Sequence, residues 1–229
     1  MYAIASHRPW NRTLCFRLER RIGQAFKLID TPEKLDPDHL RSSEVRTIFF
    51  PHWSYKIPAS VYNSFECIIF HMTDLPYGRG GSPLQNLIIS GHENTVISAL
   101  RCVETLDSGP VYLKRPLNLN GSAEEIFIRA DRIIESMIVT LIEERHEAVP
   151  QVGEPTLFKR RRPEQGDWSE VKDLDRVFDY IRMLDATGYP PAFIDVGRFR
   201  LFFTRASRRS DAVLSDVRIT IRKPGDNDT

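Results

Sequence analysis

One loop of this chain combines a histidine with a glycine-rich turn, two features suited to proton transfer and to close approach by a ligand. His71 directly follows the apolar run Glu66–Phe70, and the sequence continues as Met-Thr-Asp-Leu-Pro-Tyr-Gly-Arg-Gly-Gly-Ser to Pro83. A neutral imidazole accepts a proton near pH 7, and glycines leave the backbone open to a ligand. Taken alone, such a pairing is more typical of an exposed loop whose histidine caps a strand.

A second loop offers a carboxylate, the group that most often orients a catalytic imidazole. Asp107 lies in the turn Thr105–Gly109, between apolar segments that predict strands over Thr95–Glu104 and Pro110–Leu117. Aspartate and glycine are also ordinary turn residues, so the position by itself is compatible with a purely structural role.

Short apolar runs in the first third of the chain predict the strands that position these loops. The runs are Tyr2–Ser6, Ala25–Ile29, Val45–Phe50 and Glu66–Phe70. Because they are apolar throughout and alternate with polar or helical segments, they predict a mostly parallel sheet covered by helices, an α/β fold. Ligands bind such a sheet at its carboxyl edge, where we expect four loops to converge: His7–Asn11, Pro51–Lys56, His71–Gly81 and Thr105–Gly109.

The second half of the chain predicts one long helix and a small extension. Ser122 and Glu125 form a capping box, and an apolar stripe continues to about Arg145. A segment rich in Pro, Gly and Arg follows, so we predict a catalytic core over residues 1–150 and a C-terminal extension over 151–229. The extension is expected to hold a short helix from Leu174 to Leu184, a β pair formed by Arg198–Thr204 and Val213–Ile221, and frayed residues 223–229.

Composition excludes several classes of protein. With 32 basic and 31 acidic residues, the net charge of +1 argues against a nucleic-acid partner. Three widely spaced cysteines predict neither a disulfide framework nor a metal site, and no long apolar segment predicts a membrane span or an export signal, so we expect a cytoplasmic location. Neither phosphate-binding glycine fingerprint occurs.

Several ordered motifs together resemble the folate-dependent formyltransferases. His71–Gln85 is similar to that family's His-x-Ser/Thr-x-Leu-Pro followed by Arg-Gly-x-x-Pro-x-Gln, and Leu106–Gly109 contains its Asp-x-Gly. Ser90–Thr95 and Phe158–Glu164 match in the same order, and the resemblance covers roughly Val45 to Phe193. It implies a Rossmann-like core, 10-formyltetrahydrofolate as co-substrate, and a catalytic Asn-His-Asp trio.

The resemblance assigns two of the three catalytic positions. His71 matches the family's histidine, which would take the proton that an attacking amine sheds, and Asp107 matches the aspartate that would hold the imidazole. The asparagine two positions before the histidine is replaced by Ile69. Geometry makes Asn11, in the loop after the first strand, our candidate for the missing oxygen donor, with Asn86 as the next choice.

Binding residues follow from the same resemblance. For the pterin and its surroundings we expect Phe50, Pro51, Trp53, Ile57, Leu75, Pro76 and Asp107, although ordinary packing would account for Trp53 equally well. For the second substrate we expect Thr73, Arg79, Gly80, Gly81, Arg8 and Trp10. The basic run Lys159–Arg162 suits a diphosphate or the glutamate tail of folate, or is simply a solvated face.

The acceptor amine is the least determined part of the prediction. The segment His71–Ile88 and the later Ile181–Phe193 resemble sugar formyltransferases of surface-glycan pathways, particularly pseudaminic-acid-type ones, so we predict a nucleotide-linked 4-amino-4,6-dideoxy sugar. Two alternatives stay open, namely formylation of methionyl-tRNA and a non-catalytic relative that binds folate or a sugar nucleotide. A homodimer is also open.

Overall fold

The chain forms two compact units in a computed structural model that describes residues 1–144 and 146–222. The N-terminal unit comprises Met1–Pro83, Asn94–Leu117 and Phe127–Phe158, and the C-terminal unit comprises Leu84–Glu93, Asn118–Ile126 and residues 159–222. The predicted domain boundary between residues 150 and 151 stays a prediction. The expected fraying of residues 223–229 lies outside the described residues.

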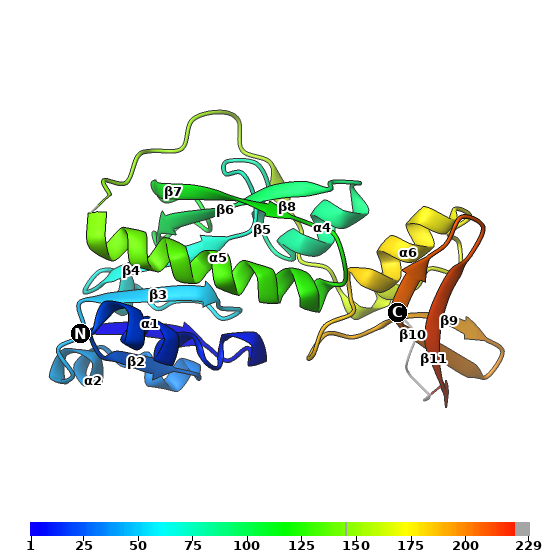
Figure 1. Ribbon diagram of the computed structural model, residues 1–229, viewed down its shortest axis with the longest axis horizontal. Coiled ribbons are helices and arrows are strands. Elements are labelled where there is room, and N and C mark those ends of the chain that lie inside the picture. The colour runs from blue at the N-terminus through cyan, green and yellow to red at the C-terminus, as the bar shows by residue number, and fades with distance from the viewer. Residues whose placement is uncertain (145, 223–229) are drawn as a thin grey trace. The chain divides into compact units, whose positions relative to one another are not determined.

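The N-terminal unit is built on a six-stranded sheet with the order β2-β1-β3-β4-β6-β7 (Figure 1). Strands β1 to β4 run parallel to one another, and β6 runs antiparallel to β4. The mostly parallel α/β fold is therefore confirmed. The strands are β1 (Tyr2–Ser6), β2 (Phe26–Ile29), β3 (Thr47–His52), β4 (Glu66–His71), β6 (Asn94–Arg101) and β7 (Val111–Asn118).

Two of the parallel strands extend further at their carboxyl ends than the apolar runs predicted. β3 ends at His52 rather than Phe50, and β4 ends at His71 rather than Phe70. Main-chain pairing in a parallel sheet does not depend on side-chain polarity, so a polar residue at the end of an apolar run can still belong to the strand. Each strand therefore delivers a histidine at the carboxyl edge of the sheet.

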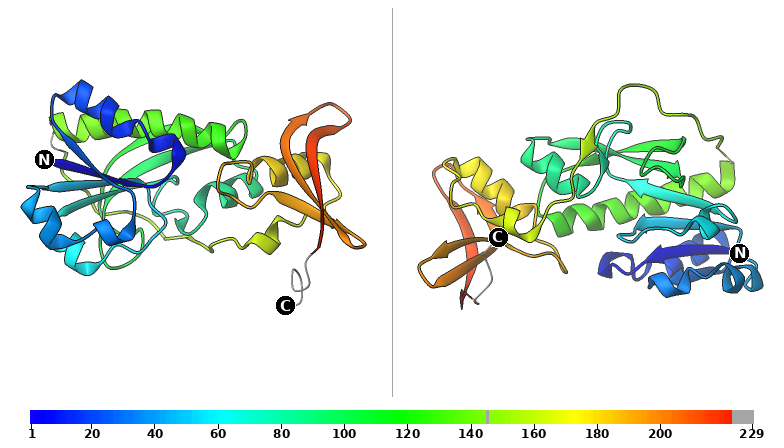
Figure 2. Two further views of the ribbon diagram at one scale, coloured as in Figure 1. Left: turned by 90° about the horizontal axis from the view of Figure 1, so that it is seen from below. Right: turned by 180° about the vertical axis from the view of Figure 1, so that it is seen from behind.

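Helices cover both faces of this sheet (Figure 2). One face carries α1 (Leu14–Ile22) and most of α5 (Ala123–Glu144), and the other carries α2 (Pro37–Ser42) and α3 (Ala59–Tyr62). The predicted capping box begins α5, since the Ser122 amide donates to Glu125 Oε2 at 2.8 Å and the Glu125 amide donates to Ser122 Oγ at 3.3 Å.

Burial on both faces explains the apolar strand sequences. Ala3, Ile4 and Ala5 in β1 are completely buried, as is Ile48 in β3. A fully buried isoleucine or leucine contributes about 1.5–3 kcal/mol to the stability of the fold. This packing holds the carboxyl ends of β1, β3 and β4 in fixed register.

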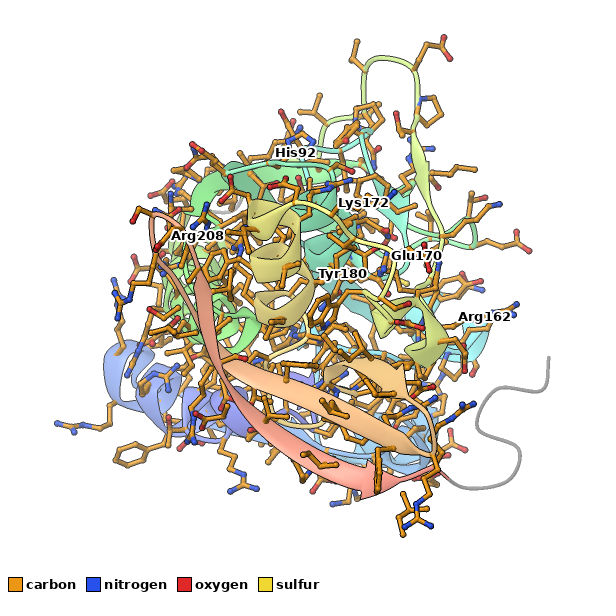
Figure 3. All side chains as sticks on the ribbon, turned by 90° about the vertical axis from the view of Figure 1, so that its right-hand side faces the viewer. His92, Arg162, Glu170, Lys172, Tyr180 and Arg208 are labelled. Atoms are coloured by element: carbon orange, nitrogen blue, oxygen red, sulfur yellow. The ribbon has the colours of Figure 1, made fainter. Side chains whose placement is uncertain are left out.

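The C-terminal unit holds a small antiparallel sheet beside one helix (Figure 3). Its strands, in the order β11-β10-β9, are β9 (Ala192–Val196), β10 (Phe199–Arg208) and β11 (Val213–Ile221). The predicted β pair thus gains a third strand that the sequence analysis missed. Helix α6 (Leu174–Arg182) joins β10 through an ion pair between Arg208 Nε and Asp175 Oδ1 at 2.5 Å.

Several short elements complete the fold. Helix α4 (Pro83–Ile89) follows the glycine-rich loop, and β5 (Arg79–Gly80) within that loop pairs in parallel with β8 (Leu157–Phe158). Three 3-10 turns span Pro9–Asn11, Pro32–Lys34 and Pro163–Gly166. Of the helices in residues 1–144 and 146–222, none is long and apolar enough to cross a membrane.

Candidate functional site

The predicted histidine is the last residue of β4 and is almost completely buried, with 6 % of its surface exposed. The loop that follows turns back on itself, because the Tyr77 amide donates to the Asp74 carbonyl at 3.0 Å. This turn brings the Gly78 carbonyl oxygen to 2.8 Å from His71 Nε2. A carbonyl only accepts hydrogen bonds, so His71 Nε2 carries a proton and the neutral ring keeps its lone pair on Nδ1.

The predicted aspartate lies near His71 Nδ1. Asp107 Oδ2 is 3.6 Å from His71 Nδ1, and only 7 % of the Asp107 surface is exposed. Asp107 adopts a left-handed backbone conformation with a φ of 52°, which the turn between β6 and β7 requires. A Cβ atom at Gly109 would meet the Arg101 carbonyl at 1.9 Å, so only glycine allows this turn to close onto β6.

The glycine-rich loop also orients the carboxylate. The Gly80 amide donates to Asp107 Oδ2 at 2.9 Å. Gly80 has a φ of 111°, and a Cβ atom there would lie 2.3 Å from the Phe158 carbonyl. The pairing of β5 with β8 therefore requires a glycine at this position, and that glycine fixes the direction of the Asp107 side chain.

The other predicted residues of this loop hold its shape. Thr73 is completely buried, and its carbonyl accepts from Ser98 Oγ at 2.7 Å. The Gly81 amide donates to the Phe158 carbonyl at 3.1 Å. Arg79 donates through Nη2 to Gln151 Oε1 at 2.8 Å. Their assignment to the second substrate stays a prediction.

Asn11 occupies a different environment from the one we expected. Its Oδ1 accepts from Ser6 Oγ at 2.7 Å, and its Nδ2 donates to Asp131 Oδ1 at 2.6 Å. Arg17 also pairs with Asp131, and burial raises the pKa of the Asp131 carboxyl group. Because both ends of the Asn11 amide are held by the protein, this geometry argues against Asn11 as the donor that replaces the asparagine missing at Ile69.

Aromatic rings gather beside this polar network at the ends of β1 and β3. Trp10 stacks on Phe127 with ring centroids 4.7 Å apart, and His52 packs against both rings. Arg8 lies over the Trp10 ring and donates to Ser54 Oγ at 3.0 Å. Burial, with the nearby Arg8 charge, lowers the pKa of His52 to about 3, so this imidazole is neutral at pH 7.

The residues expected around the pterin divide into a packed core and an accessible part. Phe50, Ile57 and Leu75 are at least 92 % buried within the protein, and Pro51 is also buried. Trp53 is half-buried, and its indole Nε1 has no hydrogen-bond acceptor among the described residues. Buried indole N–H groups usually find an acceptor. Trp53 is therefore a partly exposed member of this set, although its indole N–H is itself buried.

The remaining candidates belong to the C-terminal unit. Asn86 Nδ2 donates to the Lys159 carbonyl at 3.0 Å, and the side chains of Lys159, Arg160 and Arg162 are exposed. Arg161 Nη2 donates to the Gln165 carbonyl at 2.7 Å.

Sequence reasoning missed two residues of the N-terminal unit. Gln151 contacts both loops that carry His71 and Asp107, and nothing in its proline-rich surroundings signals this. Asp131 could have been suspected, since a charged residue interrupts the apolar stripe of α5. Among residues 1–144 and 146–222 there is no cluster of three His, Cys, Asp or Glu residues that could hold a metal ion.

Comparison with known sequences matches this chain to methionyl-tRNA formyltransferases. Residues 163–220 match a family model described as the C-terminal domain of methionyl-tRNA formyltransferase. The curated relatives matched first are methionyl-tRNA formyltransferases that are 25 %, 32 % and 29 % identical over the aligned part, and the chain spans 40 %, 32 % and 42 % of their lengths.

Solved structures extend the match over nearly the whole chain. A methionyl-tRNA formyltransferase from Clostridium thermocellum is 42 % identical, with a TM-score of 0.93 over 96 % of this chain and 99 % of that one. HypX from Aquifex aeolicus in complex with tetrahydrofolic acid is 18 % identical, with a TM-score of 0.73 over 92 % of this chain and 38 % of that one. A likely sugar N-formyltransferase from Mycobacterium tuberculosis, at 16 % identity, has a TM-score of 0.72 over 93 % and 99 %.

Proposed function

Because the chain belongs to the folate-dependent formyltransferase family, we propose that it transfers the formyl group of 10-formyltetrahydrofolate to a primary amine at His71 and Asp107. The observation that carries this proposal is the buried contact between His71 Nδ1 and Asp107 Oδ2 at 3.6 Å. A buried base beside a carboxylate suits proton transfer, and a protein that only binds folate would not need it.

The orientation of His71 defines the proton's path. His71 Nε2 is committed to the Gly78 carbonyl, so Nδ1 is the atom available to accept a proton. As the amine nitrogen bonds to the formyl carbon, it releases a proton to Nδ1. Asp107 stabilises the resulting imidazolium, which returns the proton to the folate nitrogen as the carbon–nitrogen bond to folate breaks.

The loop after β3 suits the pterin of the co-substrate. Trp53 has a buried indole N–H without an acceptor among the residues described, and Tyr55 lies beside it with ring centroids 5.2 Å apart. A flat heterocycle would pack on the exposed parts of the Trp53 and Tyr55 rings and extend the aromatic packing. HypX, whose fold this chain shares, has been solved with tetrahydrofolic acid.

For the acceptor, the comparisons favour methionyl-tRNA over our expectation of an amino sugar. The solved relative at 42 % identity bears the name methionyl-tRNA formyltransferase, whereas the sugar enzyme at 16 % identity supports the fold alone. The exposed Lys159, Arg160 and Arg162 of the C-terminal unit supply cations for a phosphate backbone despite the near-neutral net charge. We therefore place methionyl-tRNA first.

A nucleotide-linked 4-amino-4,6-dideoxy sugar is the second candidate. It is supported by the resemblance of His71–Ile88 and Ile181–Phe193 to sugar formyltransferases of surface-glycan pathways.

One assay separates the two acceptors. Purified protein is supplied with 10-formyltetrahydrofolate and either methionyl-tRNA or UDP- and dTDP-linked 4-amino-4,6-dideoxy sugars. We expect formylmethionyl-tRNA and little sugar product. The reverse pattern would establish the sugar reaction, and ligand binding without turnover of any amine would establish the non-catalytic alternative.

The basic residues provide a matched test of tRNA binding. Replacing Arg160 and Arg162 by Glu should weaken tRNA binding and lower the slope of log affinity against log salt by about one for each phosphate group that the variant no longer binds. Lys172→Glu, an exposed charge reversal in the same unit, is the control (Figure 3). Equal slopes for both variants would exclude Arg160 and Arg162 as phosphate-binding residues.

Assembly and location stay proposals as well. The exposed apolar residues Val217, Ile219 and Ile221 of β11 are where a contact between two copies would be sought, by measuring the mass in solution before and after Ile219→Lys. Three free cysteines fit the expected cytoplasmic location.

A further inference from the structure

Gln151 makes four hydrogen bonds that connect the two loops of the candidate active site. Its Nε2 donates to the carbonyl oxygens of Asp107 and Gly109, both at 2.8 Å. Its Oε1 accepts from Arg79, at 3.1 Å from Nε and 2.8 Å from Nη2. A single carboxamide thus holds the turn that carries the aspartate and the glycine-rich loop that follows His71.

The segment that carries Gln151 is itself anchored on both sides. Val149 exchanges two backbone hydrogen bonds with Val111, the first residue of β7, at 2.8 and 2.9 Å. Further on, Leu157 and Phe158 form β8 and pair with Arg79 and Gly80. Gln151 therefore lies between two fixed points, and its side chain has little freedom to leave the loops.

These hydrogen bonds affect the catalytic geometry because Asp107 lies in the turn between β6 and β7, outside both strands. The Asp107 carboxylate is directed by the Gly80 amide, which comes from the loop that Arg79 anchors. The Asp107 backbone is directed by Gln151. The spacing between Asp107 and His71 therefore depends on both loops staying in register, and Gln151 joins them.

A glutamine is chemically suited to this position and a glutamate is not. The two carbonyls need a donor, and the Arg79 guanidinium needs an acceptor; a carboxamide supplies both. A glutamate of the same length would keep the Arg79 interaction but place a carboxylate oxygen against two carbonyl oxygens. Each neutral hydrogen bond is worth only about 0.5–1.5 kcal/mol, but an unpaired buried partner costs more.

We propose that Gln151 is a positioning residue for formyl transfer, holding Asp107 at its distance from His71 by joining the Thr105–Gly109 turn to the glycine-rich loop. This inference rests on the proposed function. It assigns to the Val149–Phe158 segment a role in the reaction that is separate from substrate binding.

The test compares Gln151→Glu with Gln165→Glu. Gln165 is a suitable control because its Oε1 accepts from the Arg162 amide at 2.8 Å, a hydrogen bond that a glutamate would preserve. With the best acceptor, we expect kcat of Gln151→Glu to fall by up to about 100-fold, because a misplacement of about 1 Å in the catalytic geometry costs on that order. The KM for 10-formyltetrahydrofolate should change less than twofold, and Gln165→Glu should match the unmodified protein.

A second readout does not depend on turnover. Hydrogen exchange of the Gly80 amide, which donates to Asp107, should become faster in Gln151→Glu and in the shorter Gln151→Asn, but not in Gln165→Glu. If one Gln151 variant fails to fold, hydrogen exchange of the Gly80 amide can still be measured in the other. Unchanged kcat together with unchanged Gly80 exchange in a folded Gln151 variant would overturn the proposal.

The two readouts also separate the two hypotheses. An unmodified protein without transferase activity would refute the proposed function. Faster Gly80 exchange in the Gln151 variants would then still support the connection between the loops, and slow exchange would refute it. Faster exchange with full activity would show that the connection is structural and would overturn the catalytic role of Gln151.

Discussion

The neighbouring strands β3 and β4 each end on a histidine, but one histidine lies among aromatic rings and the other among polar groups. His52 packs between aromatic rings, 5.2 Å from the Trp10 centroid and 4.8 Å from that of Phe127, and its pKa is lowered to about 3. His71 meets the Gly78 carbonyl and the Asp107 carboxylate instead. Both strands place a histidine at the carboxyl edge of the sheet. The residues of the neighbouring loops determine whether that imidazole can act as a base.

The difference shows why burial alone does not make a base. Enclosing an imidazole among aromatic rings removes water and disfavours the charged form, so the ring stays neutral. A carboxylate beside the ring stabilises the cation formed after proton uptake. We therefore expect reactivity at the end of β4 and a structural role at the end of β3.

The largest effect on activity should come from removing the Asp107 carboxylate, which lies beside the histidine at the end of β4 and has no counterpart in the contacts described for the histidine at the end of β3. Asp107→Asn keeps the size of the side chain but cannot stabilise an imidazolium, so kcat should fall by about 10²- to 10⁴-fold, the range of general acid–base catalysis. Steady-state kinetics measures this. Asp74→Asn, in the same loop as His71 but with a mostly exposed side chain, is the control. A loss below about threefold for Asp107→Asn would place the base elsewhere.

A large loss of stability should follow from disrupting the polar network beside His52. Asp131 is 97 % buried and pairs with both Asn11 and Arg17. Asp131→Ala leaves both partners uncompensated, so the free energy of unfolding should drop by about 3–5 kcal/mol in urea denaturation. The exposed ion pair between Arg41 and Asp38 is the control, because Asp38→Ala should lower the free energy of unfolding by less than about 1 kcal/mol. Equal losses would mean that the buried network contributes no more than a surface ion pair.

A smaller effect should come from the backbone that orients Asp107. A methyl group at Gly80 would meet the Phe158 carbonyl, and its φ of 111° disfavours any side chain, so Gly80→Ala should cost about 1–3 kcal/mol. The shift of the Gly80 amide should lower kcat as well. Gly91→Ala has a similar positive φ but no neighbour within 4 Å, and should lose stability without losing activity. If both variants keep full kcat, the Gly80 amide does not orient the carboxylate.

The smallest effect at neutral pH is expected at His52. In the folded protein its pKa is about 3, against 6.5 for an unperturbed histidine, so between these values the unfolded chain binds a proton that the folded chain does not. Stability is therefore lost as the pH falls through 6.5 toward 3, by at most about 1.4 kcal/mol per pH unit. His52→Phe should reduce this acid sensitivity and change kcat less than twofold. An unchanged slope of unfolding free energy against pH would contradict the lowered pKa of His52.

Much of the scaffold was predictable because it depends on local patterns. Apolar runs predicted the parallel strands, and the capping box at Ser122 correctly predicted the start of α5. The missed strand β9 is apolar at four of its five positions, but it directly follows Pro190 and Pro191, which are typical of a loop rather than of a strand.

The site was only partly predictable. Motif spacing identified His71 and Asp107, which the fold brings within 3.6 Å. The roles of Asn11 and Gln151 depend on partners about 120 and 44 residues away, Asp131 and Asp107, and no local pattern encodes such pairings. The replacement for the asparagine missing at Ile69 is likewise a question of three-dimensional placement.

Single-turnover formyl transfer by His71→Ala tests the central claim most directly. The variant is mixed with 10-formyltetrahydrofolate and methionyl-tRNA, or with the amino-sugar panel, and product is followed beside the unmodified protein and His52→Phe. Our account predicts a loss of about 10²- to 10⁴-fold for His71→Ala, with folate binding retained and His52→Phe unaffected. Transfer by His71→Ala at the unmodified rate would contradict the assignment of His71 as the base.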